Sequence, residues 1–409
     1  MQNMKIGILT YHAACNFGAN LQVLSTYEYL KNQGHSPIII NWMTPDLERQ
    51  YKNSVPPQQV QVHKEFRENF FCMTKRCYTS EDVAQVINDE CIEAVIIGSD
   101  AVVQHHPILS RIVFPTRHIF NIISATSDTL FPNPFWGDFY KMLNVPIKMV
   151  MMSVSSQNSN YRLINKVLKR DIAKSLSHFS YISTRDDWTS KMFYNITNQK
   201  ILPKVTPDPV FAFNKNVNDI PSRDYILNKY SLPNKYYLVS FHNQTAVSYS
   251  WLEKFKELSE NNGITPVALP FPKGVTFEHP FEREIQIPLS PIDWYCLLKY
   301  SSGYIGHNMH PIVICLHNSV PCYSFDNYGI LRMRLFAEYK SSKIYHLMKL
   351  YGLLDNWCSA KGVLYKSPTP EKVLLQLQNF DTKSVERISS KRIEDYAKMM
   401  EDIISILEN

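Results

Sequence analysis

Short apolar runs alternate with longer amphipathic stretches along most of this chain. Runs such as KIGILT (5–10) and EAVIIGSD (93–100) are too short for buried helices and rich in β-branched residues, which is typical of strands covered on both faces. The stretches between them, for example residues 18–34, place apolar side chains at helical spacing. This alternation predicts an α/β protein built on parallel sheets.

The same alternation starts again in the second half of the chain. A proline-spaced stretch, PKVTPDPVFAFN (203–214), precedes a polar segment, and a new strand is expected at 236–243. A single core rarely grows beyond roughly 250–300 residues, so 409 residues favour two domains. We therefore predict two Rossmann-like domains that face a cleft, at 1–214 and 215–380, followed by an amphipathic helix at 381–409.

Composition argues against several classes of protein. The formal net charge is only +6, and no basic run with interleaved aromatic residues suggests nucleic-acid binding. The eight cysteines show no CxxC spacing, which indicates reduced thiols, and no His, Cys or carboxylate cluster has metal-ligand spacing. No apolar run approaches the about 18 residues of a membrane span, and the N-terminus does not resemble a signal peptide. We expect a soluble, cytoplasmic protein that binds neither metal nor nucleic acid.

Polar side chains gather where the expected strands end. Open parallel sheets bind ligands at the carboxyl ends of their strands, because loops and helix N-termini converge there. The residues at these positions include His12, Asn16, Ser99, Asp100, Ser153, Arg185, His242, His307, Asn308 and His310. Two such rims facing each other would enclose a binding cleft.

These polar residues also have ordinary structural interpretations. Asn16 is a typical helix cap, and Arg185 precedes two aspartates with which it could form a surface ion pair. His242 and Lys273 could serve packing and surface charge alone. His310 fits a ligand better, because histidine titrates nearest to neutrality and a helix N-terminus attracts anions.

Five segments, in this order, resemble the polysaccharide pyruvyl transferase family. That family has an Asn-aromatic-Gly turn before a helix with a Gln, a Gly-Ser-Asp motif, Arg-Asp and Asp-Pro elements, and a histidine that opens a helix before a proline-containing strand. The matching segments are TYHAACNFGANLQ (10–22), VIIGSDAVVQ (95–104), STRDDWTSKMF (183–193), TPDPVF (206–211) and SPIDWYCLLKYSSGYIGHNMHPIVICLHNSVPCYSF (290–325). The order and spacing of all five carry the resemblance.

The resemblance implies a fold like that of GT-B glycosyltransferases. It also implies a reaction in which phosphoenolpyruvate donates its pyruvyl group as a cyclic ketal across two hydroxyls of a hexose. We expect this transfer in capsule or exopolysaccharide biosynthesis, on a lipid-linked acceptor at the inner face of the membrane. Phosphoenolpyruvate would be a co-substrate, with no further cofactor. Segment FPNPFWGDFY (131–140) is either core or an exposed loop in peripheral contact with the membrane.

The resemblance also implies roles for individual residues. His310 would contact the donor phosphate and transfer a proton, Arg185 would clamp the donor, and Asp100 would act as the base for a sugar hydroxyl. Further donor contacts are expected from Asn308, His307, His242 and Lys273. Acceptor contacts are expected from Asn16, Gly18, Gln22, Ser99 and Ser153.

The chain departs from the family pattern at two places. Better-known members have an arginine two residues before the histidine, where this chain has Asn308. Another cation would then supply the charge, and the candidates are Lys273, His307 and Arg332. The Gln and Trp that often follow the family's aspartate are also absent, which predicts a different acceptor shape.

Two other functions remain open at this point. The two-domain architecture also allows a glycosyltransferase that uses a nucleotide sugar, although no carboxylate stands in a suitable place to bind its ribose. The other is a non-catalytic saccharide-binding relative, which is favoured if Asn308, in place of the family's arginine, indicates that the catalytic site has been lost.

Overall fold

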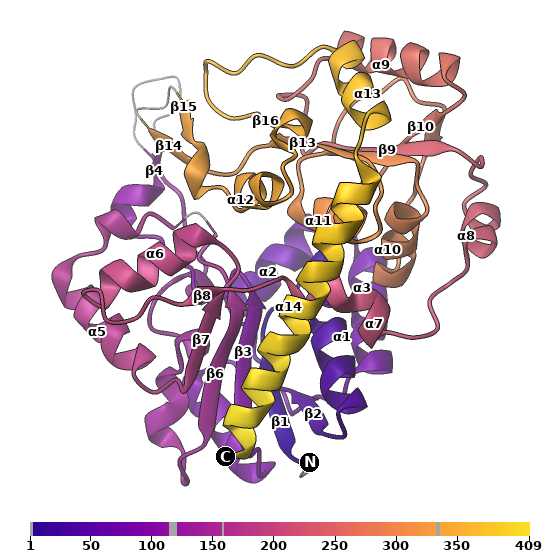
Figure 1. Cartoon of the computed structure of the whole chain (residues 1–409). Helices are drawn as coiled ribbons and strands as arrows, with labels where there is room; N and C mark the ends of the chain where they lie inside the picture. Colours follow the sequence, from indigo (N-terminus) through magenta and orange to yellow (C-terminus); the bar gives the residue numbers. More distant parts are fainter. Residues whose placement is uncertain (1–2, 114–120, 158, 333–335) are drawn as a thin grey trace.

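The computed structural model describes residues 3–113, 121–157, 159–332 and 336–409. Two six-stranded sheets, each wholly parallel, lie in two lobes (Figure 1). Each sheet is covered by helices, so its strands are buried on both faces and read as apolar runs. The predicted α/β architecture is confirmed.

The N-terminal lobe holds the sheet with strand order β2-β1-β3-β6-β7-β8. Its strands are β1 (Lys5–Leu9), β2 (Ser36–Ile39), β3 (Ala94–Asp100), β6 (Lys148–Val154), β7 (Tyr181–Thr184) and β8 (Lys204–Val205). Its helices are α1 (Phe17–Asn32), α2 (Pro45–Ser54), α3 (Pro57–Phe70), α4 (Ser80–Asp89), α5 (Lys166–Leu176) and α6 (Asp187–Ile196). A small antiparallel hairpin joins β4 (Ile112–Val113) to β5 (Asn121–Ile122).

The C-terminal lobe holds the sheet with strand order β11-β10-β9-β12-β13-β16. Its strands are β9 (Tyr236–Ser240), β10 (Thr265–Ala268), β11 (Arg283–Glu284), β12 (Gly303–Gly306), β13 (Cys322–Asp326) and β16 (Trp357–Ser359). The hairpin strands are β14 (Ile330–Arg332) and β15 (Phe336–Glu338). The helices from the linker onward are α7 (Phe213–Asn216), α8 (Arg223–Lys229), α9 (Tyr249–Asn261), α10 (Pro291–Lys299), α11 (Met309–His317), α12 (Lys343–Leu350) and α13 (Pro370–Gln378).

Helix α14 (Thr382–Glu408) runs along both lobes (Figure 1). Near its start, the Ser389 hydroxyl forms a hydrogen bond of 3.0 Å with the Tyr351 hydroxyl of the C-terminal lobe. Further along, Tyr396 packs edge-on against Tyr29 of α1, with ring centroids 5.7 Å apart, and the Met399 sulfur accepts from the Ser153 hydroxyl at 3.3 Å. This helix therefore fastens the two lobes to each other.

Segment 131–140 belongs to the core of the N-terminal lobe. Phe135, Trp136 and Phe139 are fully buried, and Trp136 packs edge-on against Phe193 of α6. The interpretation of this segment as an exposed membrane loop is therefore wrong, because its aromatic rings fill the lobe interior. Within the described ranges, no helix combines the length and apolar character that crossing a membrane requires.

Candidate active site

A cavity of about 480 Å³ lies between the two lobes. In each sheet the strand order reverses next to the first strand of the lobe, between β1 and β3 and between β9 and β12. Ligands of open α/β sheets bind at such switch points. The cavity lies at both of them, and its lining includes Tyr11, Asn16, Gly18, Asp100, Asp128, His242, Lys273, Asn308, His310, Tyr328 and Lys343.

Two helices begin at this cavity. The first turns of α1 and α11 both line it. Their free N–H groups and the positive ends of their helix dipoles can therefore bind an anion in the cavity. Asn16 caps α1 by accepting from the Ala19 N–H at 3.2 Å. Asn308 does not cap α11, because its Oδ1 instead pairs with His242 Nε2 at 2.9 Å. The N-terminus of α11 is therefore left without a side-chain cap.

Gly18 allows the two lobes to approach each other at His310. A Cβ atom at Gly18 would lie 2.1 Å from both Cγ and Nδ1 of the imidazole. No side chain fits in that space, so the close approach explains why the Asn-Phe-Gly turn ends in glycine. The opening motif and the C-terminal histidine, which lie far apart in sequence, are thus in direct contact.

Replacing Gly18 with alanine should displace the His310 ring and lower turnover about a hundredfold, because misplacing a reacting group by about 1 Å has a cost of that order. Steady-state rates of the pyruvyl transfer proposed below, together with thermal unfolding to confirm folding, test this. A G18A protein that folds and reacts like the wild type would show that the ring position is unimportant.

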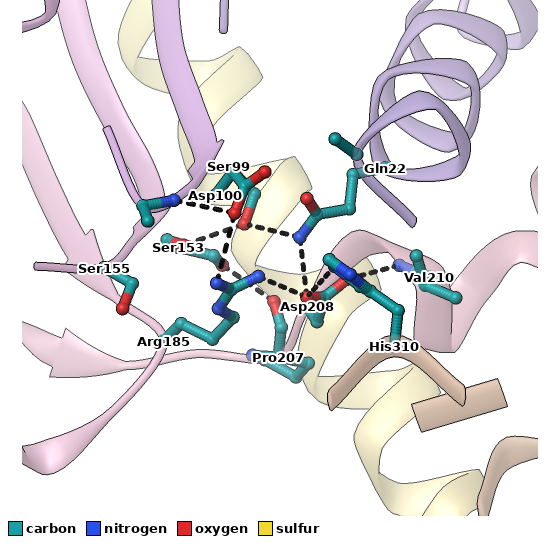
Figure 2. A network of polar contacts seen from close by, with 12 residues as sticks. Gln22, Ser99, Asp100, Ser153, Ser155, Arg185, Pro207, Asp208, Val210 and His310 are labelled. Carbon is teal, nitrogen blue, oxygen red and sulfur yellow. Dashed lines mark hydrogen bonds and ion pairs between the residues drawn. The ribbon is translucent and has the colours of Figure 1, made fainter. Parts of the chain in front are cut away.

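Asp208 connects several of these polar residues in one network (Figure 2). Its Oδ2 lies 2.7 Å from Arg185 Nη1, 2.6 Å from Gln22 Nε2 and 3.8 Å from His310 Nε2. Its Oδ1 accepts from the Val210 N–H at 2.9 Å. Arg185 and His310, from different lobes, therefore meet at one carboxylate, and the interpretation of Arg185 as part of a surface ion pair is wrong.

Asp100 is the second carboxylate bound to Arg185. Its Oδ1 lies 3.4 Å from Nη2, and its backbone has a φ of 93°, which is uncommon outside glycine. Burial alone would raise the pKa of Asp100, but Arg185, His310 and Lys343 together lower it. For Arg185, burial is outweighed by Asp208 and Asp100, which raise its pKa. The pair is therefore ionised at neutral pH.

His310 is neutral at physiological pH in the ligand-free protein. Burial lowers the pKa of this imidazole to about 4, although Asp208 and Asp100 oppose the shift. The side chain belongs to a residue only 9% exposed, and its Nε2 makes no hydrogen bond within the described residues. This ring nitrogen is buried and faces the Asp208 carboxylate at 3.8 Å, whereas other atoms of His310 line the cavity.

Lys343 is a site residue that sequence reasoning missed. It is the first residue of α12 and lines the cavity. Its side-chain ammonium makes no hydrogen bond or ion pair within the described part of the chain. Its Nζ lies over the Tyr328 ring, 4.8 Å from the centroid. Burial, followed by Arg185, lowers the pKa of Lys343 to about 8. No motif signals this lysine, because only the tertiary fold brings it to the cleft.

Several predicted site residues lie behind the cavity wall. Ser99 donates to the Ser153 carbonyl at 2.8 Å, and Ser153 donates to the Pro207 carbonyl at 2.7 Å. Gln22 holds Asp208, and His307 Nδ1 accepts from the His242 N–H at 3.0 Å. The cavity lining includes none of Gln22, Ser99, Ser153 and His307, and it does not include Arg185, the predicted donor clamp.

The predicted donor residues Asn308, His242 and Lys273 do line the cavity. His242 stacks on Phe271 with ring centroids 4.2 Å apart, and burial lowers the pKa of its imidazole. Burial also lowers the pKa of His307, to about 3, so that side chain is not the missing cation. The side chain of Arg332 lies outside the described residues.

Comparison with protein-family models shows the family to which a chain with this site belongs. The model of the polysaccharide pyruvyl transferase family matches residues 16–328. The chain belongs to this family. The match begins at the α1 cap and ends at Tyr328, so the polysaccharide pyruvyl transferase region contains Asp100, Arg185 and His310 but not Lys343 or α14.

Solved structures place this polysaccharide pyruvyl transferase family member in the GT-B fold. A UDP-GlcNAc 2-epimerase from Neisseria meningitidis bound to UDP-GlcNAc is 9% identical, with a TM-score of 0.55 over 99% of this chain and 100% of the other. A UGT transferase from Siraitia grosvenorii in complex with UDP is 10% identical, with a TM-score of 0.50 over the whole of both chains. No curated protein sequence matches significantly. These similarities show the fold alone.

Proposed function

We propose that this protein transfers the pyruvyl group of phosphoenolpyruvate onto two hydroxyls of a hexose as a cyclic ketal. The observation that carries the proposal is the buried imidazole of His310, which lies at the uncapped N-terminus of α11 and belongs to a residue that lines the cavity between the lobes. Such a position suits a group that contacts a phosphate and moves a proton. Membership of the family supplies the reaction class.

The chemistry requires one proton donor, one proton acceptor and a set of anion contacts. A proton adds to the vinyl carbon of the donor, and a sugar hydroxyl forms a C–O bond to the adjacent carbon. The bond from that carbon to the phosphate oxygen then breaks, and the second hydroxyl closes the ring. Over the whole reaction the two hydroxyls lose two protons, the new methyl group gains one and the phosphate gains one, so the protons balance.

The residues around the cavity can meet these requirements. His310 would take up a proton when the phosphate dianion binds, since a nearby negative charge favours the charged imidazole, and would then protonate the vinyl carbon. The N–H groups of α11 and the ammonium of Lys343 would hold the anionic oxygens of the donor. Arg185 would act from beneath, by fixing Asp208 and Asp100.

The acceptor is proposed to be part of a larger glycan in capsule or exopolysaccharide synthesis. A second cavity of about 1060 Å³ shares Gln50, Thr126 and Thr129 with the first, which leaves room for sugar units beyond the reacting hexose. All eight cysteines are unpaired, which supports a reducing, cytoplasmic site of action. A lipid-linked acceptor would bring the protein to the inner face of the membrane.

The test is a transfer assay with purified protein. The protein is incubated with phosphoenolpyruvate and synthetic or lipid-linked glycans, and the acceptor is followed by mass spectrometry together with release of phosphate. A mass increase that matches a pyruvyl ketal, with one phosphate released for each ketal, supports the proposal. Transfer from a nucleotide sugar alone, or glycan binding with no transfer, would reject it.

Lys343 should set an upper pH limit on capture of the donor. With a pKa of about 8 it is cationic below that pH and neutral above it, so kcat/KM for phosphoenolpyruvate should fall as the pH rises through about 8. Lys343→Met should weaken capture about ten- to a hundredfold at neutral pH, because one charge-assisted contact is lost.

The arginine variant provides the decisive comparison for this pH limit. A guanidinium stays charged, so K343R should keep kcat/KM flat across the range in which the wild type declines. Lys273→Arg is the matched control, since Lys273 lines the same cavity and its replacement should leave the decline in place. A K343R profile that declines like the wild type would assign the titration to another group.

A further inference from the structure

Asp128 is a buried carboxylate in the cavity wall to which the reaction above gives no role. The residue is only 2% exposed and lies in the N-terminal lobe, next to the shared rim of the two cavities. Its Oδ2 accepts from the Tyr11 hydroxyl at 2.7 Å, whereas its Oδ1 has no hydrogen-bond partner within the described residues. A buried oxygen without a donor is unfavourable, and a ligand hydroxyl would supply one.

Asp128 and Asp100 line the same cavity under opposite electrostatic conditions. Asp100 is paired with Arg185 at 3.4 Å, whereas no Lys, Arg or His nitrogen of the described chain lies within 4.0 Å of the Asp128 carboxylate. Burial raises the pKa of Asp128 although hydrogen bonding from the Tyr11 and Thr126 side chains opposes the shift, while the pKa of Asp100 is lowered. When two carboxylates of one site differ in this way, the one with the raised pKa is the better proton acceptor.

The wall around Asp128 has the composition of a sugar site. Tyr11, Tyr51 and Gln104 line the cavity with it and offer aromatic faces and amide or hydroxyl groups. The Tyr11 ring packs edge-on against Phe135 of the lobe core, with centroids 4.9 Å apart, so its hydroxyl is held firmly toward Asp128. His310 faces the same cavity from the other lobe. A donor at His310 and an acceptor at this wall would therefore share one cavity.

We infer that Asp128 binds a hydroxyl of the sugar acceptor and takes its proton as the bond to the donor carbon forms. The inference rests on the proposed function. The hydroxyl O–H bond breaks, a C–O bond forms from that oxygen to the carbon bearing the phosphate, and the proton moves to the carboxylate. When the carbon–phosphate oxygen bond breaks, Asp128 returns this proton to the leaving phosphate and is again ionised.

The test replaces Asp128 with asparagine, which keeps the shape and removes the proton acceptor. D128N should lower kcat for pyruvyl transfer about a hundredfold and leave the Kd for phosphoenolpyruvate, measured by calorimetry, within about twofold of the wild type. Asp138→Asn is the matched control. Asp138 is a half-buried carboxylate with one buried, unpartnered oxygen and a raised pKa, but it does not line the cavity.

The outcomes separate this inference from the proposed function. A D128N protein that turns over like the wild type overturns the inference and leaves the proposed function in place. A D138N protein that loses as much activity as D128N does the same. A wild type that transfers no pyruvyl group overturns both. If D128N does not fold, Tyr11→Phe decides. Loss of the hydroxyl that orients Oδ2 should lower kcat about tenfold at unchanged donor Kd, and an unchanged kcat again overturns the inference.

Discussion

Replacing His310 with glutamine is expected to lower kcat for pyruvyl transfer by about 10²- to 10⁴-fold, the usual contribution of a general acid. Glutamine keeps much of the volume and one N–H donor, so contact with the donor survives while the transferable proton is lost. Initial rates at saturating donor and acceptor measure the effect. The Kd for phosphoenolpyruvate should change far less, and a kcat within threefold of the wild type would remove His310 from the proton transfer.

The same variant has a second readout in the protons that accompany donor binding. The pKa of His310 is about 4 in the ligand-free protein, so the ring is neutral at pH 6 to 7 and must gain a proton when a phosphate dianion binds beside it. Calorimetry in buffers of different ionisation enthalpy should show uptake of about one proton by the wild type and far less by H310Q, in which only the small unprotonated fraction of Lys343 can take up a proton. Uptake should vanish below about pH 4, where the ring is already charged. Equal uptake by both proteins would place the proton elsewhere.

Replacing Arg185 with methionine is expected to destabilise the protein by about 3–5 kcal/mol, the range for removing one partner of a buried ion pair. The arginine side chain is 2% exposed and its partner Asp208 is fully buried, so the carboxylate would lose its buried counterion. Urea unfolding measures the loss. Arg170→Met is the control, because the Arg170 side chain is 78% exposed and its ion pair with Asp171 should contribute less than about 1 kcal/mol.

A second substitution checks the cause of that destabilisation. Adding Asp208→Asn to R185M removes the stranded charge, so the double variant should be more stable than R185M alone. Contacting residues of one network are expected to be non-additive in this way. A double variant that loses the sum of the two single effects would show that burial of charge is not the reason.

The fold could be predicted from the sequence because periodicity reports burial directly. Apolar runs such as KIGILT are strands covered on both faces, and the spacing in 18–34 matches α1 closely. Helices α2 and α3 were not expected, since few of their residues are buried and only half of those are large apolar side chains: Leu47 in α2, and Gln59, His63 and Phe66 in α3. Their ends are set by prolines at the first turns and by tertiary contacts instead.

The site was predictable only where residues follow strands. Arg185 and His310 could be singled out because each lies at a strand end, and the structure brings both to the Asp208 carboxylate. Position alone did not separate His307 from His310, which lie three residues apart but face different surroundings. Lys343 and Asp128 follow irregular segments, so nothing local marks them, and their burial beside the cavity comes from the assembled lobes.

Helix α14 has a consequence for how the chain is made. Its residues Tyr396, Met399 and Ile403 are buried, and Lys148 of β6 donates to the Ile406 carbonyl at 2.9 Å. The surface of the N-terminal lobe that they cover is therefore exposed on the ribosome until the whole second lobe has been translated. We therefore expect chaperones that bind apolar surface to bind this face during synthesis, because the N-terminal sheet is made first and the helix that buries it is made last.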